Sequence, residues 1–307
     1  MAGSLPLIMT YVINFGIPPL LFTQVLYGSF LYTSSVLIGF WWISVILLVI
    51  LVYSSLYAGG ERAAKAKAWW PLGFVALMIA YTIARIYSSN MTLMLRPGVW
   101  MEMFRTHPHG TILPHGDPTL VLRWLFMLAG SLTMGGLALI VMGTRQTYPV
   151  AVKAFMVRNG GWITALGAML QTSLAFRVYQ AQPVTVQTKL FETPLYHTLS
   201  MVWLGLAVGG ILLGVLTLIR RGKTSVVLAT VAAALALLLT ATMVVYRDGI
   251  RDLTLLVNGY QVWDLKVVAN WPVVTLFLGS FLIALLLLGW LILVAVKAKP
   301  IQEEVAP

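Results

Sequence analysis

The sequence predicts an all-α integral membrane protein, a bundle of about eight transmembrane helices with both termini in the cytoplasm. Of its 307 residues, 60% are hydrophobic and only 9% are charged, and the first 60 residues contain no Lys, Arg, Asp or Glu. Soluble domains carry about 25% charged residues, so this composition excludes a soluble enzyme. Lysines and arginines also alternate between loops in the way that the positive-inside rule describes.

A helix that crosses the hydrocarbon core of a bilayer needs about 20 mostly apolar residues. The sequence contains eight such runs, and we expect spans at 5–27, 34–57, 69–89, 118–143, 161–181, 196–219, 225–246 and 271–296. The first run lacks a basic start and an Ala-x-Ala end, so we do not expect a cleavable signal peptide. The connections are short, which predicts one membrane domain over residues 1–307.

The first span contains a double proline, Pro18-Pro19, between Asn14 and Gln24. Prolines remove backbone donors, so we expect a kink there that exposes carbonyl groups. Gln24 beside this kink could line a quinone pocket or make an interhelical amide hydrogen bond.

The orientation follows from the loops after the second, fourth and sixth spans and from the segment after the eighth. All their basic residues fall on one side, which we assign to the cytoplasm: Arg62, Lys65, Lys67, Arg145, Lys153, Arg158, Arg220, Arg221, Lys223, Lys297 and Lys299. The opposite loops hold six basic residues balanced by six acids: Arg96, Arg105, Lys189, Arg247, Arg251 and Lys266 against Glu102, Asp117, Glu192, Asp248, Asp252 and Asp264. The net charge of +11 is therefore a topology signal, and we expect no nucleic-acid partner.

Three arginines are expected at one depth near the outer surface, each about one helical turn inside its span: Arg85, Arg123 and Arg177. Each could snorkel to the interface along its own long stem. Together they could instead bind an anionic group such as haem propionates, a quinone head group or a lipid phosphate, because guanidinium groups bind oxyanions in a bidentate manner.

The segment 101–120 is rich in His, Pro and Gly. Its prolines forbid a continuous helix, and Asp117-Pro118 is typical of an N-cap followed by the first helical position, which would hold His115 just above the membrane. The histidines could simply hydrogen-bond to the backbone. A metal site formed by His107, His109 and His115 is a second possibility, and haem ligation by His115 or His197 is a third.

Methionines and glycines in the fourth, fifth and sixth spans allow two interpretations. Met127 shares a helix face with Arg123, and it could fill the core or serve as a haem ligand opposite a histidine. The glycines could allow close helix packing or leave room for a flat macrocycle.

Two absences from the sequence exclude further classes. No Asp or Glu lies in the middle of a predicted span, which argues against an ion pump or proton-driven carrier. The chain has no cysteine, which excludes disulfides, iron–sulfur clusters, covalent c-type haem and thiolate zinc sites.

The stretches NFGIPPLLFTQVLYGSFLYTSSVL (Asn14 to Leu37) and LPHGDPTLVLRWLFMLAGSL (Leu113 to Leu132) resemble bacterial inner-membrane proteins related to cytochrome bd subunit I. This resemblance covers at most the first four spans. It implies a haem b and quinol subunit in the bacterial cytoplasmic membrane that works with a periplasmic multihaem c-type cytochrome. It also implies a further first helix with a histidine, missing here or supplied by another subunit. The chain lacks the glutamate haem ligand and the Gly-Arg-Gln-Pro-Trp motif of true subunit I, so we do not expect a terminal oxidase.

The sequence thus predicts a membrane subunit of a respiratory complex that exchanges electrons between the quinone pool and a periplasmic redox partner, beside other membrane subunits. The expected cofactors are a quinone and possible haem b, with His115 and His197 as candidates for the haem iron. The expected cofactor-binding residues are His115, His197, Arg85, Arg123, Arg177, Met127 and Gln24. The alternatives are a haem-free quinone-binding subunit, a scaffold that anchors a periplasmic partner through 90–117 and 247–270, and a transporter.

Overall fold

The computed structural model describes residues 2–144, 148–261, 264 and 270–297. Arg145, Lys266 and Lys299, which contribute to the charge count, lie outside the described residues. The chain divides into two compact units, Met1–Val262 and Trp263–Pro307. All regular structure in the described residues is helical, including two short 3-10 helices at Ala2–Ser4 and Pro97–Val99.

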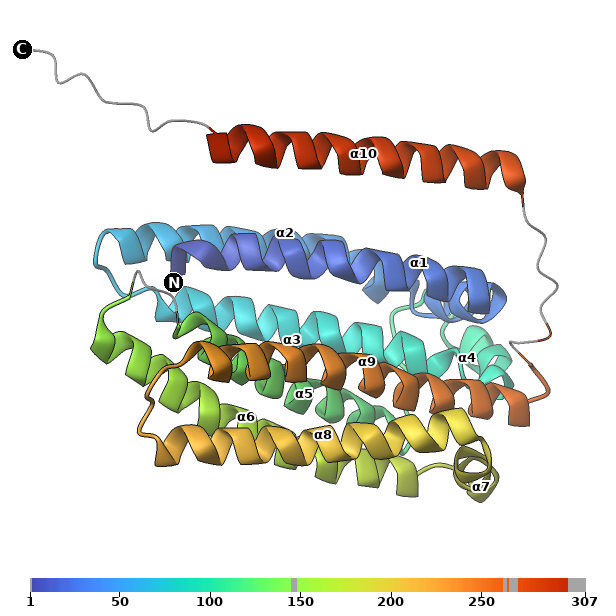
Figure 1. The fold of residues 1–307 in the computed structure, drawn as a ribbon. Helices are drawn as coiled ribbons and strands as arrows, with labels where there is room; N and C mark the ends of the chain where they lie inside the picture. Colours follow the sequence, from blue (N-terminus) through green and yellow to red (C-terminus); the bar gives the residue numbers. More distant parts are fainter. Residues whose placement is uncertain (1, 145–147, 262–263, 265–269, 298–307) are drawn as a thin grey trace, which may run out of the picture. The chain divides into compact units, whose positions relative to one another are not determined.

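Long helices run side by side in the first unit, while two short helices, α4 and α7, lie at one end of it (Figure 1). In chain order the α-helices of this unit are α1 (Leu5–Leu37), α2 (Gly39–Ala64), α3 (Trp70–Leu93), α4 (Trp100–Thr106), α5 (Leu120–Met142), α6 (Val150–Gln180), α7 (Val184–Glu192), α8 (Pro194–Ile219) and α9 (Val226–Val257). The second unit contains α10 (Trp271–Lys297).

Seven of the described helices are long and apolar enough to cross a membrane, namely α1, α2, α3, α5, α8, α9 and α10. Their surfaces agree with this assignment, because large hydrophobic side chains are exposed along the lengths of α1, α2 and α8. Such surfaces are stable against lipid and unstable against water. The chain is therefore a multi-pass helical membrane protein.

The remaining predicted span corresponds to α6, which begins at Val150, well before the predicted start at residue 161. Its composition is too polar to place it among the candidate spans of the described chain. Two of its polar side chains, Thr164 and Gln171, nevertheless face a neighbouring helix and are buried. A helix shielded by α5 and α8 needs less apolar surface than one that faces lipid.

Glycines bring α5, α6 and α8 into backbone contact. A Cβ atom added to Gly136 would lie 2.6 Å from the carbonyl oxygen of Gly160, and one added to Gly161 would lie 3.0 Å from that of Gly214. Gly130 leaves the space that Gln171 occupies, because a Cβ there would lie 2.6 Å from Nε2. Of the two interpretations of these glycines, the structure supports close packing.

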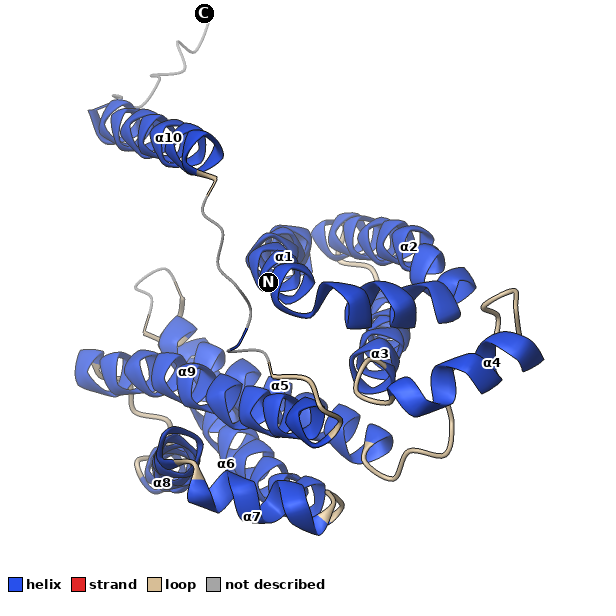
Figure 2. Ribbon diagram, turned by 90° about the vertical axis from the view of Figure 1, so that its right-hand side faces the viewer, coloured by secondary structure: helices blue, strands red, loops and turns tan. Residues whose placement is uncertain are grey.

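Helix α1 bends at Tyr27 and not at the double proline. Pro18 and Pro19 lie inside the helix, whereas Tyr27 has non-helical angles (φ −121°, ψ 25°). The rest of α1 turns across the end of the bundle towards α2 (Figures 1 and 2). The prediction that α1 bends at the double proline is therefore wrong. Tyr27 is buried against Leu255 of α9, and this tertiary contact accompanies the change of direction.

Several predicted boundaries also differ. Helix α1 continues to Leu37 and α2 runs from Gly39 to Ala64, so residues 28–33, expected between two spans, are helical. Helix α5 begins at Leu120 and not at Pro118, because Asp117 Oδ1 accepts hydrogen bonds from the Thr119 backbone nitrogen (2.6 Å) and Oγ1 (2.7 Å) and holds the preceding turn. Helix α9 continues to Val257, beyond the predicted end at residue 246. Residues 247–257, expected as a loop, form the last three turns of this helix.

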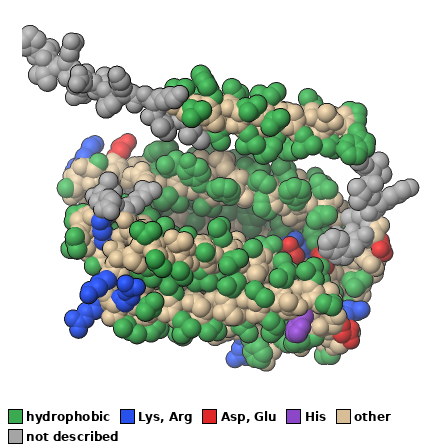
Figure 3. Space-filling view, in the orientation of Figure 1, with side chains coloured by type: hydrophobic (Ala, Val, Ile, Leu, Met, Phe, Trp, Pro, Cys, Tyr) green, Lys and Arg blue, Asp and Glu red, His purple; other side chains and the backbone are tan. Residues whose placement is uncertain are grey.

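Charged side chains gather at the two ends of the first unit, with a broad apolar band between them (Figure 3). The end of α2, the beginning of α6, the end of α8 and the loops beside them form one end, which we call the basic end. Among the described residues it carries one acid, Glu61, and these basic residues: Arg62, Lys65, Lys67, Lys153, Arg158, Arg220, Arg221 and Lys223. The opposite, mixed-charge end carries Arg96, Glu102, Arg105, Asp117, Lys189, Glu192, Arg247, Asp248, Arg251 and Asp252. This separation follows the predicted alternation of the loops.

Candidate functional site

A carboxylate at the mixed-charge end joins three helices. Asp252 of α9 accepts a short hydrogen bond from the Tyr27 hydroxyl of α1 at Oδ1. At Oδ2 it accepts a 2.7 Å hydrogen bond from the Tyr196 hydroxyl of α8. Hydrogen bonds to an ionised acceptor are stronger than neutral ones, so this carboxylate fastens α1 and α8 to α9. We call Asp252, Tyr27 and Tyr196 the carboxylate brace.

Arg251 adds a positive charge beside the brace. Its guanidinium carbon lies 5.1 Å from the centre of the Tyr27 ring, within the range of a cation–π interaction. Its Nη2 also lies 3.3 Å from Asp248 Oδ1, one turn back on the same helix. The carboxylate of Asp252 is thereby held close to a compensating cation.

Arg123 is fixed at the start of α5. Its Nε donates a 3.0 Å hydrogen bond to Thr119 Oγ1, and its Nη2 donates a 3.2 Å hydrogen bond to Gln182 Oε1. It lies within electrostatic range of Arg247 and Arg251. The structure therefore gathers Arg123 with two arginines of α9.

Arg96 completes this set of charges. Its Nε lies 3.7 Å from Asp117 Oδ2, and its Nη1 donates a 3.1 Å hydrogen bond to the carbonyl oxygen of His115. Four arginines (96, 123, 247 and 251) thus accompany three aspartates (117, 248 and 252), which leaves one positive charge among them.

Neither the brace nor the arginines of α9 were expected, because residues 247–270 were predicted to form a loop. A signal for them was present. Arg247-Asp248 and Arg251-Asp252 repeat the same charge pair four residues apart, which is the spacing that stacks side chains on one helix face.

The three arginines predicted to lie at one depth do not share contacts, because their side chains leave their helices in different directions. Arg85, on α3, is half-buried and donates a 3.2 Å hydrogen bond from Nη1 to Ser89 Oγ on its own helix. Arg177, on α6, is exposed and has no hydrogen bond or ion pair within the described chain. Neither joins Arg123 in the described contacts.

The predicted histidine ligands lie on different elements. His115 is exposed in the segment before α5, while His197 is half-buried in the first turn of α8 with its ring centre 5.2 Å from that of Phe191. No group of three or more His, Asp or Glu residues in the described chain could hold a metal ion. The predicted metal site of His107, His109 and His115 therefore has no support from the geometry.

None of the described contacts joins the residues expected to hold haem b to one another. His115 and His197 make no contact with each other in the described chain, and Met127 is exposed on α5. Backbone contacts at Gly136, Gly160 and Gly161 also close the interfaces between α5, α6 and α8 against a macrocycle.

A buried hydrogen-bond donor without an acceptor lies where α3 meets α5. The indole Nε1 of Trp124 is buried and has no partner in the described chain. Its ring packs edge-on against Tyr81, with 4.1 Å between the ring centres. Arg85 lies one turn from Tyr81 on α3, and Met127 lies three residues after Trp124 on α5. A buried unpaired N–H costs about 1–3 kcal/mol, which makes this position a candidate for a ligand that supplies an acceptor.

We call Trp124, Tyr81 and Arg85 the α3–α5 site. Its two donors, an indole N–H and a guanidinium, suit carbonyl oxygens, which only accept hydrogen bonds. Quinones present two such oxygens on an apolar ring, so the residues of this site fit a quinone head group. Gln24 of α1 is half-buried and makes no hydrogen bond within the described residues.

No protein family, no curated protein and no solved structure matches the chain.

Proposed function

We propose that the chain is a haem-free, quinone-binding membrane subunit of a respiratory electron-transfer complex. The observation that carries this proposal is the unpaired indole N–H of Trp124 beside Tyr81 and Arg85. The form without haem is favoured because backbone contacts at Gly136, Gly160 and Gly161 leave no room for a macrocycle between α5, α6 and α8. A quinone pool is dissolved in lipid, where a multi-pass protein can reach it.

The proposed topology places the basic end in the cytoplasm and the mixed-charge end outside a bacterial inner membrane. It counts eight spans, with α6 as the eighth, and puts both termini in the cytoplasm. The distribution of charge between the two ends supports this orientation. A periplasmic redox subunit would then meet the mixed-charge end, where α4 and α7 lie (Figure 1).

The residues of the α3–α5 site have separate tasks in this proposal. A bound quinone supplies two-electron redox chemistry coupled to protons. Trp124 would donate its indole N–H to a carbonyl oxygen of the quinone, and Arg85, whose guanidinium bonds to Ser89, would offer further N–H groups. Tyr81 packs on the indole ring and fixes its direction.

The test is the amount of quinone that copurifies with the protein in a mild detergent. We expect Trp124→Phe to lower the quinone extracted per protein at least fivefold, because it removes the donor and keeps an aromatic ring. The matched control is Trp70→Phe, since Trp70 is exposed at the start of α3, near the opposite end of that helix from Arg85. Equal quinone in the two variants, or none in the unaltered protein, would overturn the proposal.

A scaffold function is the second candidate, favoured by exposed apolar side chains at the mixed-charge end. Met101 and Phe104 of α4 are both exposed there, where a periplasmic partner would dock. If the chain only anchors a partner, Met101→Ser with Phe104→Ser releases that partner, whereas Trp124→Phe leaves electron transfer in the assembled complex unchanged. If the chain is a quinone-binding subunit, Trp124→Phe lowers electron transfer in the assembled complex.

A further inference from the structure

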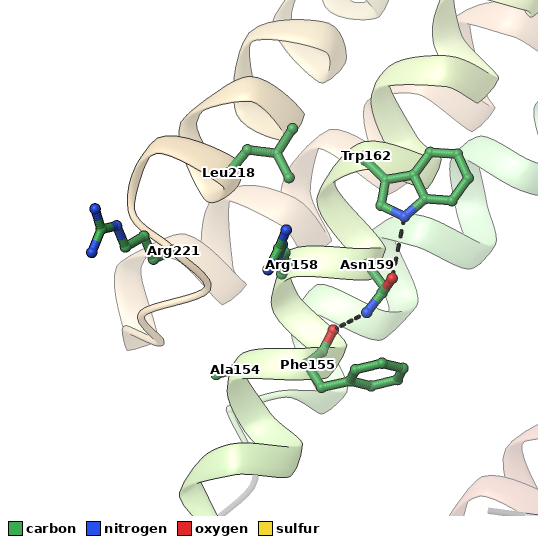
Figure 4. Close-up of a pocket in the computed structure, with 7 residues that line it drawn as sticks. All are labelled: Ala154, Phe155, Arg158, Asn159, Trp162, Leu218 and Arg221. Carbon is green, nitrogen blue, oxygen red and sulfur yellow. Dashed lines mark hydrogen bonds between the residues drawn. The ribbon is translucent and has the colours of Figure 1, made fainter.

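An open groove at the basic end, far along the chain from the α3–α5 site, separates the beginning of α6 from the end of α8 (Figure 4). Its volume is about 630 Å³, within the range of ligand pockets, about 300–1,000 Å³. The groove combines arginines with apolar side chains: Ala154, Phe155, Arg158, Asn159, Trp162, Leu218 and Arg221.

The polar side chains of the groove come from two helix ends. Arg158 projects from α6 between Leu218 and Trp162, and Arg221 stands on the opposite wall with its guanidinium turned outward (Figure 4). Asn159 is fixed in place, because Nδ2 donates to the Phe155 carbonyl oxygen (2.7 Å) and Oδ1 accepts from Trp162 Nε1 (3.2 Å). Neither arginine has an acidic partner within the described residues, so both charges are uncompensated.

Arg221 occupies a backbone position that disfavours a side chain. It has φ +49°, in the left-handed region, and it precedes Gly222 at φ +73°. A glycine in this region has no strain, whereas other residues do. The turn is also packed on α6, because a Cβ added to Gly222 would lie 3.1 Å from the backbone carbon of Ala154. Arg221 thus occupies a rigid backbone position at which a glycine would make the protein more stable.

The groove also presents apolar side chains to the outside. Trp162 and Leu218 are exposed on the side of the arginines that faces the middle of the helices, and Phe155 is exposed nearer the basic end. Tryptophan is enriched at membrane–water interfaces, and basic pockets between membrane helices bind anionic head groups. A soluble anion would use the arginines alone, whereas a phospholipid would also cover the apolar side chains.

From these observations we propose that the α6–α8 groove binds an anionic phospholipid, with Arg158 and Arg221 on its phosphate and Trp162 and Leu218 against its acyl chains. Arg221 turns inward to do so, which its flexible stem allows. This site is separate from the proposed quinone function and does not depend on it.

The test is a titration of the purified protein in neutral detergent with phosphatidylglycerol, followed by native mass spectrometry and by thermal unfolding. We expect phosphatidylglycerol to bind at least tenfold more tightly than phosphatidylcholine and to raise the unfolding temperature. Arg158→Gln with Arg221→Gln should weaken this binding at least fivefold. The control pair, Lys67→Gln with Arg220→Gln, removes the same charge from the basic end outside the groove and should change binding less than twofold.

Arg221→Gly separates binding from folding. It relieves the left-handed strain, so we expect a higher unfolding temperature without lipid together with a smaller increase on addition of phosphatidylglycerol. Equal effects of the two double variants, or no preference for phosphatidylglycerol, would overturn the proposal. Displacement of the lipid by millimolar inorganic phosphate would also overturn it, because the site would then be one for a free anion.

Discussion

At the scale of single residues, the carboxylate brace shows how one side chain can organise three helices. Asp252 accepts hydrogen bonds from Tyr27 and Tyr196, and Arg251 supplies the nearby positive charge. In a medium of low dielectric constant these interactions are strong, and losing one partner leaves the others uncompensated. The bend of α1 occurs at Tyr27 itself, so the brace also fixes where the chain changes direction.

We therefore predict that Asp252→Asn lowers the free energy of unfolding by about 1–3 kcal/mol, because the neutral amide loses the charge and one acceptor oxygen. Thermal or denaturant unfolding in detergent measures this change. Asp248→Asn is the matched control, since Asp248 is one turn away with its side chain 41% exposed, and it should cost less than about 0.5 kcal/mol. Equal losses in the two variants would show that Asp252 is no more than a surface charge.

The predicted arginine layer illustrates a physical limit at this scale. Position along a span estimates the depth of a residue, but the direction of its side chain around the helix depends on packing. Arg85 therefore bonds to its own helix, Arg177 faces outward, and only Arg123 lies among the partners of the mixed-charge end. The unpaired indole N–H of Trp124 could not be predicted either, because a sequence does not show whether a buried donor has an acceptor.

At the scale of elements, apolar length was sufficient to predict most helices and insufficient for two of them. Helices that face lipid must be apolar along their whole length, so α3, α5 and α8 match their predicted ranges within about four residues at both ends. The polar beginning of α6 and the charged end of α9 are stabilised by neighbouring elements instead. Hydropathy cannot detect such segments. The Arg-Asp pair that repeats after four residues in α9 does indicate a helix there.

The glycines of α5 provide a test at the same scale. Gly136 touches the backbone of α6, while its neighbour Gly135 has open space around it. Gly136→Ala forces the helices apart, and we expect it to cost about 1–3 kcal/mol of unfolding free energy. Gly135→Ala should be neutral or stabilising by up to about 1 kcal/mol, because alanine is the better helix former. Equal free energies of unfolding for the two variants would show that α5 and α6 do not approach closely at Gly136.

At the scale of the whole molecule, the question is whether α6 crosses the membrane. It has the length of a span, but its polarity separates it from the seven candidates in the described chain. Burial of Thr164 and Gln171 against α5 keeps these two polar groups away from lipid, which lowers the cost of such a span. An eight-span protein with α6 included also keeps every basic loop on one side.

Two exposed residues on either side of α6 make this question measurable. Val150 begins α6 and Val184 begins α7, and the chain contains no cysteine, so Val150→Cys or Val184→Cys introduces a unique thiol. We expect a membrane-impermeant maleimide to label Val184→Cys in intact cells and Val150→Cys only after permeabilisation, because α6 puts them on opposite sides. Lys67→Cys and Phe104→Cys provide the reference pattern for the basic and mixed-charge ends. Labelling of Val150→Cys and Val184→Cys from the same side would remove α6 from the spans and reverse the assignment of the helices that follow it.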